Sequence, residues 1–196
     1  MPDVDSILRG VEDGHAESVQ QLFDLLYGEL RERAHGQRRR WDGNLTLNTT
    51  AILHEAYIKL AGSALERVQD QAHFLALASR AMRQVLMDYA RRAQAQRRGA
   101  GARHVALDEA LPAGSSMPHT VVTELLDLER ALERLGTQHP DAVAVVECRF
   151  FGGMTVAETA AALNISTPTV KRRWAVARSW LYAVVVSDHG EIVQGA

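Results

Sequence analysis

The chain contains very little cysteine, since Cys148 is the only one among 196 residues. A single cysteine excludes a disulfide within the chain and fits a reducing compartment. Its apolar surroundings, AVAVVECRFF, indicate a buried structural thiol rather than a nucleophile.

Long hydrophobic runs are also missing. The longest apolar runs, AVAVV and LYAVVV, are too short to cross a bilayer, and no charged-then-apolar signal peptide opens the chain. We therefore expect a soluble, cytoplasmic protein with no membrane partner.

The chain has no excess of one charge sign, because its formal net charge is −2. This balance argues against indiscriminate binding to nucleic acid. The charges are nevertheless segregated: residues 80–103 contain seven arginines and one acid, Asp88, whereas acids dominate residues 107–133. Alternating basic and acidic blocks favour a protein that contacts DNA with some faces and another protein with others.

Motifs for catalysis and for metal binding are absent too. His54-Glu55 begins the zincin motif, but Ile58 stands where the second histidine is required. The eight histidines are scattered without ligand spacing, and the chain has neither a glycine-rich phosphate loop nor a Gly-x-Ser-x-Gly elbow. We therefore expect no catalytic residue, no metal site and no cofactor, and an enzyme is disfavoured.

Helical periodicity is what the chain does have, and it predicts an all-α fold. The expected helices cover residues 6–12, 16–40, 49–61, 72–98, 121–135, 140–151 and two short helices within 155–182. Residues 99–119 carry glycines and prolines without a helical stripe, which is typical of a flexible linker. The sequence thus predicts two small helical domains, 1–98 and 120–187, on either side of this linker.

Residues 155–182 are typical of a helix-turn-helix. The two apolar stripes consist of Val156, Ala160 and Leu163, and of Val170, Trp174, Ala177 and Leu181. Asn164, Ile165 and Ser166 interrupt the period between them. Ser166 or Thr167 can cap the second helix, and Pro168 fits its first turn.

The second of these helices carries four cations and no acid. A helix of this kind suits the major groove of DNA, with some side chains on bases and flanking cations on phosphates. The alternative is an ordinary helical hairpin with a solvated basic face. The residues expected to bind DNA here are Thr167, Thr169, Lys171, Arg172, Arg173 and Arg178.

The helix expected over residues 72–98 combines an apolar stripe with a basic face. The stripe comprises Phe74, Leu77, Ala78, Ala81, Val85 and Tyr89, and the opposite side shows Arg80, Arg83, Met87 and Arg91. A solvated face normally mixes both charge signs, so we expect contact with nucleic acid. RNA, an acidic protein surface and plain solvation are the alternatives.

The helix expected over residues 49–61 turns Ile52, Ala56 and Leu60 inward. Its polar strip comprises His54, Glu55, Ile58 and Lys59. We interpret this strip as a protein-contact surface, with plain solvation as the alternative.

Together, three segments resemble a bacterial RNA polymerase sigma factor of the extracytoplasmic-function (ECF) type, over roughly residues 5–185. TAILHEAYIKLAG (50–62) resembles the helix that docks on the clamp coiled coil of the polymerase. HFLALASRAMRQVLMDYARRAQAQRRG (73–99) resembles the helix that melts and recognises the −10 element. RFFGGMTVAETAAALNISTPTVKRRWAVARSWL (149–181) resembles the helix-turn-helix that recognises the −35 element.

The resemblance implies roles for particular residues. Core polymerase binding is implied for Leu53, His54, Glu55, Ile58 and Lys59. Recognition and melting of the −10 element are implied for His73, Arg80, Arg83, Met87, Arg91 and Arg92. A flipped non-template base would enter a pocket at the loop 62–71, and the linker would run toward the active-site and RNA-exit channel of the polymerase.

The implied partners are the clamp and flap of core RNA polymerase, double-stranded promoter DNA and the melted non-template strand. An anti-sigma factor or another regulator stays open. The chain departs from the common pattern at Thr50 and Ala51, where many members carry acids, and at His54, where glutamine is common. It resembles the subgroup with a His-Glu-Ala-Tyr helix. Two rivals remain from the residues alone: a stand-alone helix-turn-helix regulator, and a helical adaptor that binds only proteins.

Overall fold

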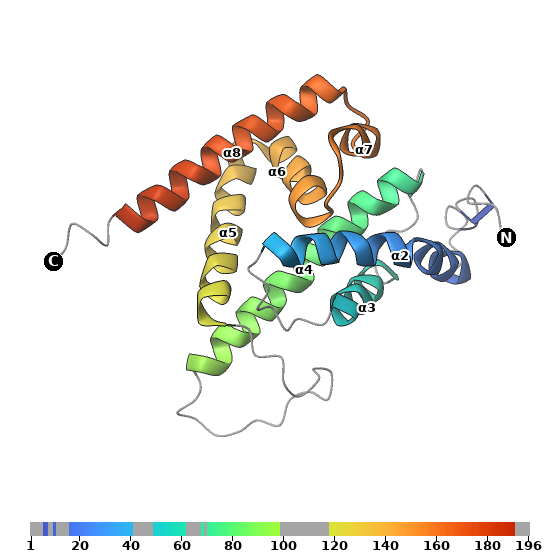
Figure 1. Cartoon of the computed structure of the whole chain (residues 1–196), viewed down its shortest axis with the longest axis horizontal. Helices are drawn as coiled ribbons and strands as arrows, with labels where there is room; N and C mark the ends of the chain where they lie inside the picture. Colours follow the sequence, from blue (N-terminus) through green and yellow to red (C-terminus); the bar gives the residue numbers. More distant parts are fainter. Residues whose placement is uncertain are drawn as a thin grey trace.

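The computed structural model describes residues 6, 7, 10, 16–40, 49–61, 68, 70–98 and 118–190. Over these residues the chain forms helices and no strand, which agrees with the all-α prediction. The elements are α2 (Ala16–Arg40), α3 (Thr49–Ala61), α4 (Gln71–Arg98), α5 (His119–Gln138), α6 (Pro140–Val146), the π-helical turn η2 (Glu147–Phe151), α7 (Val156–Ala162) and α8 (Thr167–Gly190), shown in Figure 1. No helix in the described part of the chain is both long and apolar enough to cross a membrane.

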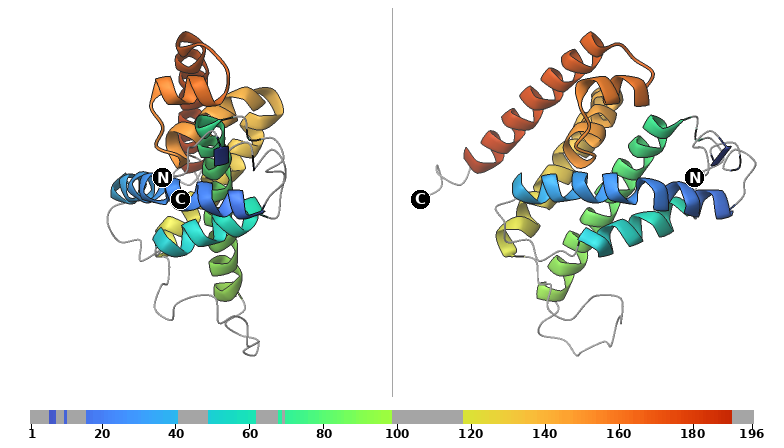
Figure 2. Two further views of the ribbon diagram at one scale, coloured as in Figure 1. Left: turned by 90° about the vertical axis from the view of Figure 1, so that its right-hand side faces the viewer. Right: turned by 45° about the vertical axis from the view of Figure 1, so that its right-hand side comes forward.

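Helix α4 lies at the centre of the molecule. Helix α3 packs on it and on α2, while α5, η2 and α7 pack on it from the C-terminal half. Helix α8 lies on α5, α6 and α7, and its last turns extend past α5 (Figures 1 and 2). Two sets of helices, one from each half of the chain, therefore share α4 as a common support.

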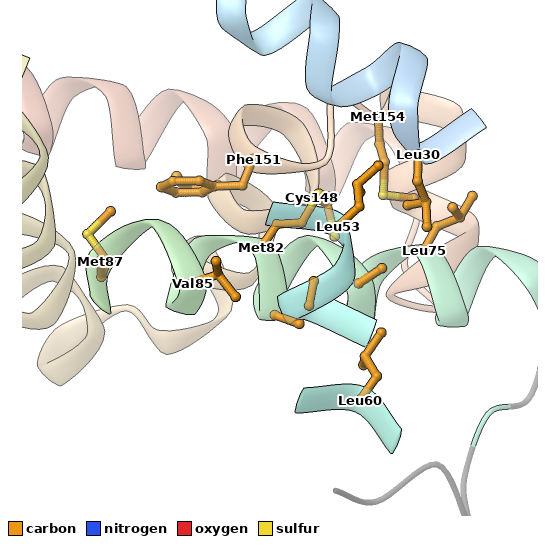
Figure 3. Packing of buried hydrophobic residues seen from close by; sticks show 14 of the residues in the cluster. Leu30, Leu53, Leu60, Leu75, Met82, Val85, Met87, Cys148, Phe151 and Met154 are labelled. Carbon is orange, nitrogen blue, oxygen red and sulfur yellow. The ribbon is translucent and has the colours of Figure 1, made fainter. Parts of the chain in front are cut away.

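One hydrophobic cluster runs through these contacts. It joins Leu53 and Phe74 from the N-terminal half to Leu125 and Phe151 from the C-terminal half, each 4% exposed or less. Figure 3 shows Phe151, Cys148 and Met154 on the side of the C-terminal elements and Met82, Val85 and Met87 along α4. Burying a large apolar side chain contributes about 1.5–3 kcal/mol, so this cluster is the main force that holds the halves together.

Most of the predicted helices occur at the expected positions. The bounds of α2 and α3 are those predicted, α4 begins one residue earlier, and α5 is longer by two residues at its start and three at its end. The helix predicted over 140–151 is divided into α6 and η2, where the Gly152 amide donates to the Glu147 carbonyl at 2.9 Å.

Other predictions fall largely on residues that the structure does not describe. The linker 99–119 is described only from Pro118, the opening helix only at three positions, and the loop 62–71 only at Val68, Asp70 and Gln71. The division into two domains therefore stays a prediction.

Gly152 lies in close contact with Ser79 of α4. A Cβ at this position would overlap the Ser79 hydroxyl oxygen and lie 2.6 Å from the Cys148 carbonyl oxygen. Ser79 itself is buried and donates to the Leu75 carbonyl at 2.6 Å. Gly153 follows with a φ of 61°, a conformation that favours glycine. The predicted Gly-Gly separator thus also includes a glycine that the close contact with Ser79 requires.

Candidate nucleic-acid interface

Local hydrogen bonds fix the starts of both helices of the α7–α8 pair. Thr155 and Glu158 form a capping box, in which the Glu158 amide donates to the Thr155 hydroxyl at 3.2 Å and the Thr155 amide donates to the Glu158 carboxylate at 2.6 Å. Asn164 takes a φ of 50° in the turn. Ser166 accepts from the Thr169 amide at 3.3 Å, so it caps α8 as predicted.

The apolar face of α8 packs inward. Val170 and Ala177 are fully buried, and Trp174 and Leu181 are half-buried against the same core. The Arg149 guanidinium lies 5.1 Å from the centre of the Trp174 ring. This contact joins η2 to α8 and has no signal in the local sequence, so it was not predicted. These contacts fix which side of α8 faces outward.

The outward side of α8 presents cations to solvent. Lys171, Arg172 and Arg178 are exposed, and Val176 is 39% exposed beside them. Thr167 is exposed and Thr169 is half-buried at the start of the helix. An exposed basic helix face of this shape can bind phosphates and place side chains against base edges.

Arg173 differs from the other cations of α8. Its guanidinium pairs with the Asp141 carboxylate of α6, and its side chain is 26% exposed. This pair holds the start of α8 against the start of α6. Arg173 was expected among the DNA contacts, and nothing in its local sequence indicated the partner 32 residues away.

The basic face predicted on α4 is only partly exposed. Arg80 and Arg92 are exposed, with the Arg92 guanidinium 5.9 Å from the centre of the Tyr89 ring. Met87 is 1% exposed and belongs to the core. The expectation that Met87 faces outward is wrong here, because α5 and η2 pack against α4.

Arg83 was also expected to face outward, but its side chain is mostly buried. Its guanidinium pairs with Glu129 at 2.9 Å and with Glu147 at 2.7 Å, and all three side chains are 13% exposed. Burial lowers the pKa of Arg83, but the two carboxylates outweigh that effect and leave this pKa raised. Arg91, 53% exposed, pairs with Asp88 at 3.5 Å and with Glu129 at 3.6 Å. The acids of the C-terminal half thus neutralise the middle of this face.

The start of α4 is capped locally. The His73 amide donates to the Asp70 carboxylate at 2.7 Å, and the His73 side chain is half-buried. Phe74 is fully buried in the core rather than turned toward a partner.

The strip predicted on α3 is partly exposed and partly half-buried. His54 is exposed and Ile58 is 51% exposed, whereas Glu55 and Lys59 are half-buried. The Lys59 ammonium pairs with Asp88 of α4 at 2.9 Å. Burial, and then the Glu55 carboxylate, raise the pKa of the Tyr89 hydroxyl.

Leu53 was also expected among the residues that bind core polymerase, and the structure places its side chain in the core. It is fully buried, because the inward stripe follows Leu53, Ala56 and Leu60 instead of starting at Ile52. Ile52 is half-buried at the edge of that stripe.

Within the residues that the structure describes, no three histidine, cysteine, aspartate or glutamate side chains gather closely enough to hold a metal ion. The features that stand out are instead two basic helix faces, one exposed and one covered, and an exposed apolar residue on α3.

Comparison with known proteins identifies the family. A family model described as ECF sigma factor matches residues 1–186. No curated protein and no solved structure matches the chain. The family match spans every helix from α2 to α7 and most of α8. The chain therefore belongs to the ECF sigma factor family, and as a sigma factor it binds core RNA polymerase and directs promoter-specific transcription initiation.

Proposed function

We propose that three surfaces of this sigma factor carry separate tasks: α3 docks on the polymerase clamp, α4 contacts the −10 element, and the α7–α8 pair recognises the −35 element. Sigma factors are transcription regulators rather than enzymes, so each task is one of binding. The polymerase supplies the bond-forming chemistry.

The observation that carries the proposal is the exposed basic face of α8, held outward by a fully buried opposite face at Val170 and Ala177. Arg172 is in the middle of this face and is proposed to hydrogen-bond base edges. Lys171 and Arg178 are proposed to bind phosphates on either side. Arg173, held by Asp141, is proposed to keep the helix start in place.

On α3, the proposed polymerase contact centres on Ile58 and His54. Ile58 is one of few large apolar side chains exposed in the described part of the chain. An exposed apolar residue beside polar ones is typical of a contact between proteins. The proposal includes the subgroup with a His-Glu-Ala-Tyr clamp-binding helix, on the residues His54 to Tyr57.

On α4, Arg80, Arg91 and Arg92 are proposed to bind the backbone of the melted strand, because their side chains reach solvent. His73 is proposed to lie near the flipped base at the start of the helix. Arg83 and Met87 can join this surface only if the C-terminal helices move away. The two domains 1–98 and 120–187, with the linker 99–119 between them, are proposed on the same grounds.

Run-off transcription tests the proposal. Purified core polymerase would transcribe a library of upstream fragments with and without the protein, and we expect new promoter-dependent start sites when it is present. Tight, specific DNA binding by the protein alone, without any new start site, would instead support a stand-alone regulator. Start sites that survive Arg172→Glu unchanged would contradict the role of α8, with Arg134→Glu on α5 as the control for an exposed charge reversal.

A further inference from the structure

The outward face of α8 is not uniformly basic. Arg172, Val176 and Ser179 lie in one row along the helix, because successive side chains are separated by about 100° around its axis. This row is opposite the buried Val170 and Ala177, and all three of its side chains are exposed. The row therefore begins with a cation and continues with uncharged side chains.

Cations lie on both sides of this row. Lys171 and Arg178 are exposed on one flank, and Arg173, paired with Asp141, lies on the other. Phosphates border a DNA groove and base edges form its floor, so the flanking cations suit phosphates and the row between them suits bases. Figure 1 shows α8 along the outer edge of the molecule, with α5 and α6 packed on one side of it. A groove could therefore receive the row directly.

Val176 is the apolar member of the row. Its side chain is 39% exposed, although helix propensity disfavours a β-branched residue at an exposed helical position. One turn separates it from Arg172, a rise of about 6 Å along the helix, and base pairs follow one another at about 3.4 Å. A side chain one turn past Arg172 therefore meets a base pair about two steps away in the same groove.

We propose that Val176 determines specificity at one base pair of the promoter by packing on the C5-methyl group of a thymine. The inference rests on the proposed role of α8 at the −35 element. The thymine methyl is the apolar group that a base pair presents in the major groove. Cytosine instead presents an amino group at this edge, and a valine side chain would leave that donor unpaired. The thymine should lie within about two base pairs of the pair that Arg172 contacts.

Deoxyuridine tests this contact, because it pairs like thymine and lacks only the methyl group. Core polymerase reconstituted with the full-length chain would bind a labelled promoter fragment selected by run-off transcription, with each thymine of the upstream element replaced by deoxyuridine in turn. We expect one replacement to weaken binding by the parent about fourfold, the effect of exposing one methyl group. Val176→Ala should bind the thymine fragment as weakly as the parent binds the deoxyuridine fragment, and deoxyuridine should cost it nothing further.

Two further variants on the same helix serve as controls. Tyr182→Ala also truncates an exposed apolar side chain, but one that lies about 120° around the helix from Val176, so it should keep the parent response to deoxyuridine. Val176→Thr retains one methyl group and should show an intermediate response. Alanine favours a helix more than valine does, so Val176→Ala should not lower the free energy of unfolding. A purely structural role for Val176 would not produce a selective loss at one thymine.

The results separate the contact of Val176 from the role of α8. If no deoxyuridine fragment binds the parent more weakly, or if Val176→Ala shows the same loss at the same thymine, the inference is wrong. It is also wrong if no thymine lies within about two base pairs of the pair at which Arg172→Ala loses discrimination. The role of α8 would stand in each of these cases, provided that Arg172→Glu lowers promoter binding. Parent-like binding of every fragment by Arg172→Glu would instead overturn the proposed role of α8 itself.

Discussion

The two basic helices of this protein, α8 and α4, differ in how far their cations are exposed. Helix α8 turns Lys171, Arg172 and Arg178 to solvent, and these three form no ion pair within the described part of the chain. Helix α4 has at least as many cations, yet its central Arg83 is bound by two carboxylates from a distant part of the chain. Cation content is therefore a poor measure of a DNA-binding surface. The decisive property is whether acidic side chains elsewhere in the chain pair with those cations.

The difference has a geometric cause. The opposite side of α8 is packed by its own neighbours α5, α6 and α7, so its basic side is left outward. Helix α4 is packed from both halves of the chain, and a central helix has little surface left to expose. The basic face of α8 is thus exposed, whereas the middle of the basic face of α4 is covered.

The largest predicted effect is on stability, and it should differ between Arg83 of α4 and Arg172 of α8. Arg83→Ala should lower the free energy of unfolding by about 3 kcal/mol, because it leaves Glu129 and Glu147 without their partner in a mostly buried site. Arg172→Ala should change it by less than about 0.5 kcal/mol, as is usual for an exposed side chain. Urea unfolding followed by circular dichroism measures both.

Arg80→Ala is the control for Arg83→Ala, because Arg80 is an exposed arginine on the same helix. It should behave like Arg172→Ala. Equal losses for Arg80 and Arg83 would mean that the ion pairs on α4 contribute nothing, and the contrast between the two helices would disappear.

The second effect concerns function at the exposed helix. Arg172→Glu should lower transcription from a selected promoter about a hundredfold, because it removes the proposed base contact and would place a carboxylate against DNA. Co-purification with core polymerase should remain at the parent level, since α3 is unchanged. Loss of both properties would mean that α8 is not a separate recognition surface.

Local signals predicted much of this structure. The bounds of α2 and α3, the Ser166 cap and the inward face of α8 at Val170 and Ala177 all follow from residues within a few positions of one another. Helix periodicity and capping are properties of short segments, so a single sequence contains them.

Contacts between distant residues could not be predicted in the same way. The partners of Arg83 lie 46 and 64 positions away, and no periodicity links them to α4. The misplacement of Leu53 has another cause: Ile52 and Leu53 are both apolar, so the pattern alone does not fix which of them faces inward. The exposed site on α8 was thus predictable, and the covered site on α4 was not.

A smaller effect follows from the thiol beneath the covered face. Burial, and then the Glu147 carboxylate, raise the pKa of Cys148 to about 12, whereas an unfolded thiol titrates near about 8.5. The neutral thiol is favoured in the folded state, so its contribution to stability is complete below the unfolded pKa. That contribution is lost as the pH rises toward the folded pKa, by about 1.4 kcal/mol per pH unit.

Cys148→Ala isolates this contribution. The free energy of unfolding of the parent minus that of Cys148→Ala should stay constant from pH 7 to 8 and fall between pH 9 and 10. Urea titrations of both proteins at each pH give the difference, in which the other titrating groups cancel. A difference that is independent of pH would place the thiol in contact with water, and so would argue against a closed contact between η2 and α4.

The smallest predicted effect tests whether Asp141 leaves the basic face of α8 open to DNA. Arg173 is the one cation of the α8 basic face that pairs with a carboxylate in the described structure, and exposed pairs of this kind contribute about 0.2–1 kcal/mol. If Arg173 positions the helix, Arg173→Ala and Asp141→Ala should each weaken promoter binding by the holoenzyme about twofold, and the double variant should be no worse than either one. Fluorescence anisotropy with a labelled promoter fragment measures all three. If Arg173→Ala instead costs as much as Arg172→Ala while Asp141→Ala strengthens binding, then Asp141 competes with DNA for Arg173. In that case carboxylates would cover arginines on both basic helices. The two helices would differ only in how strongly those carboxylates bind.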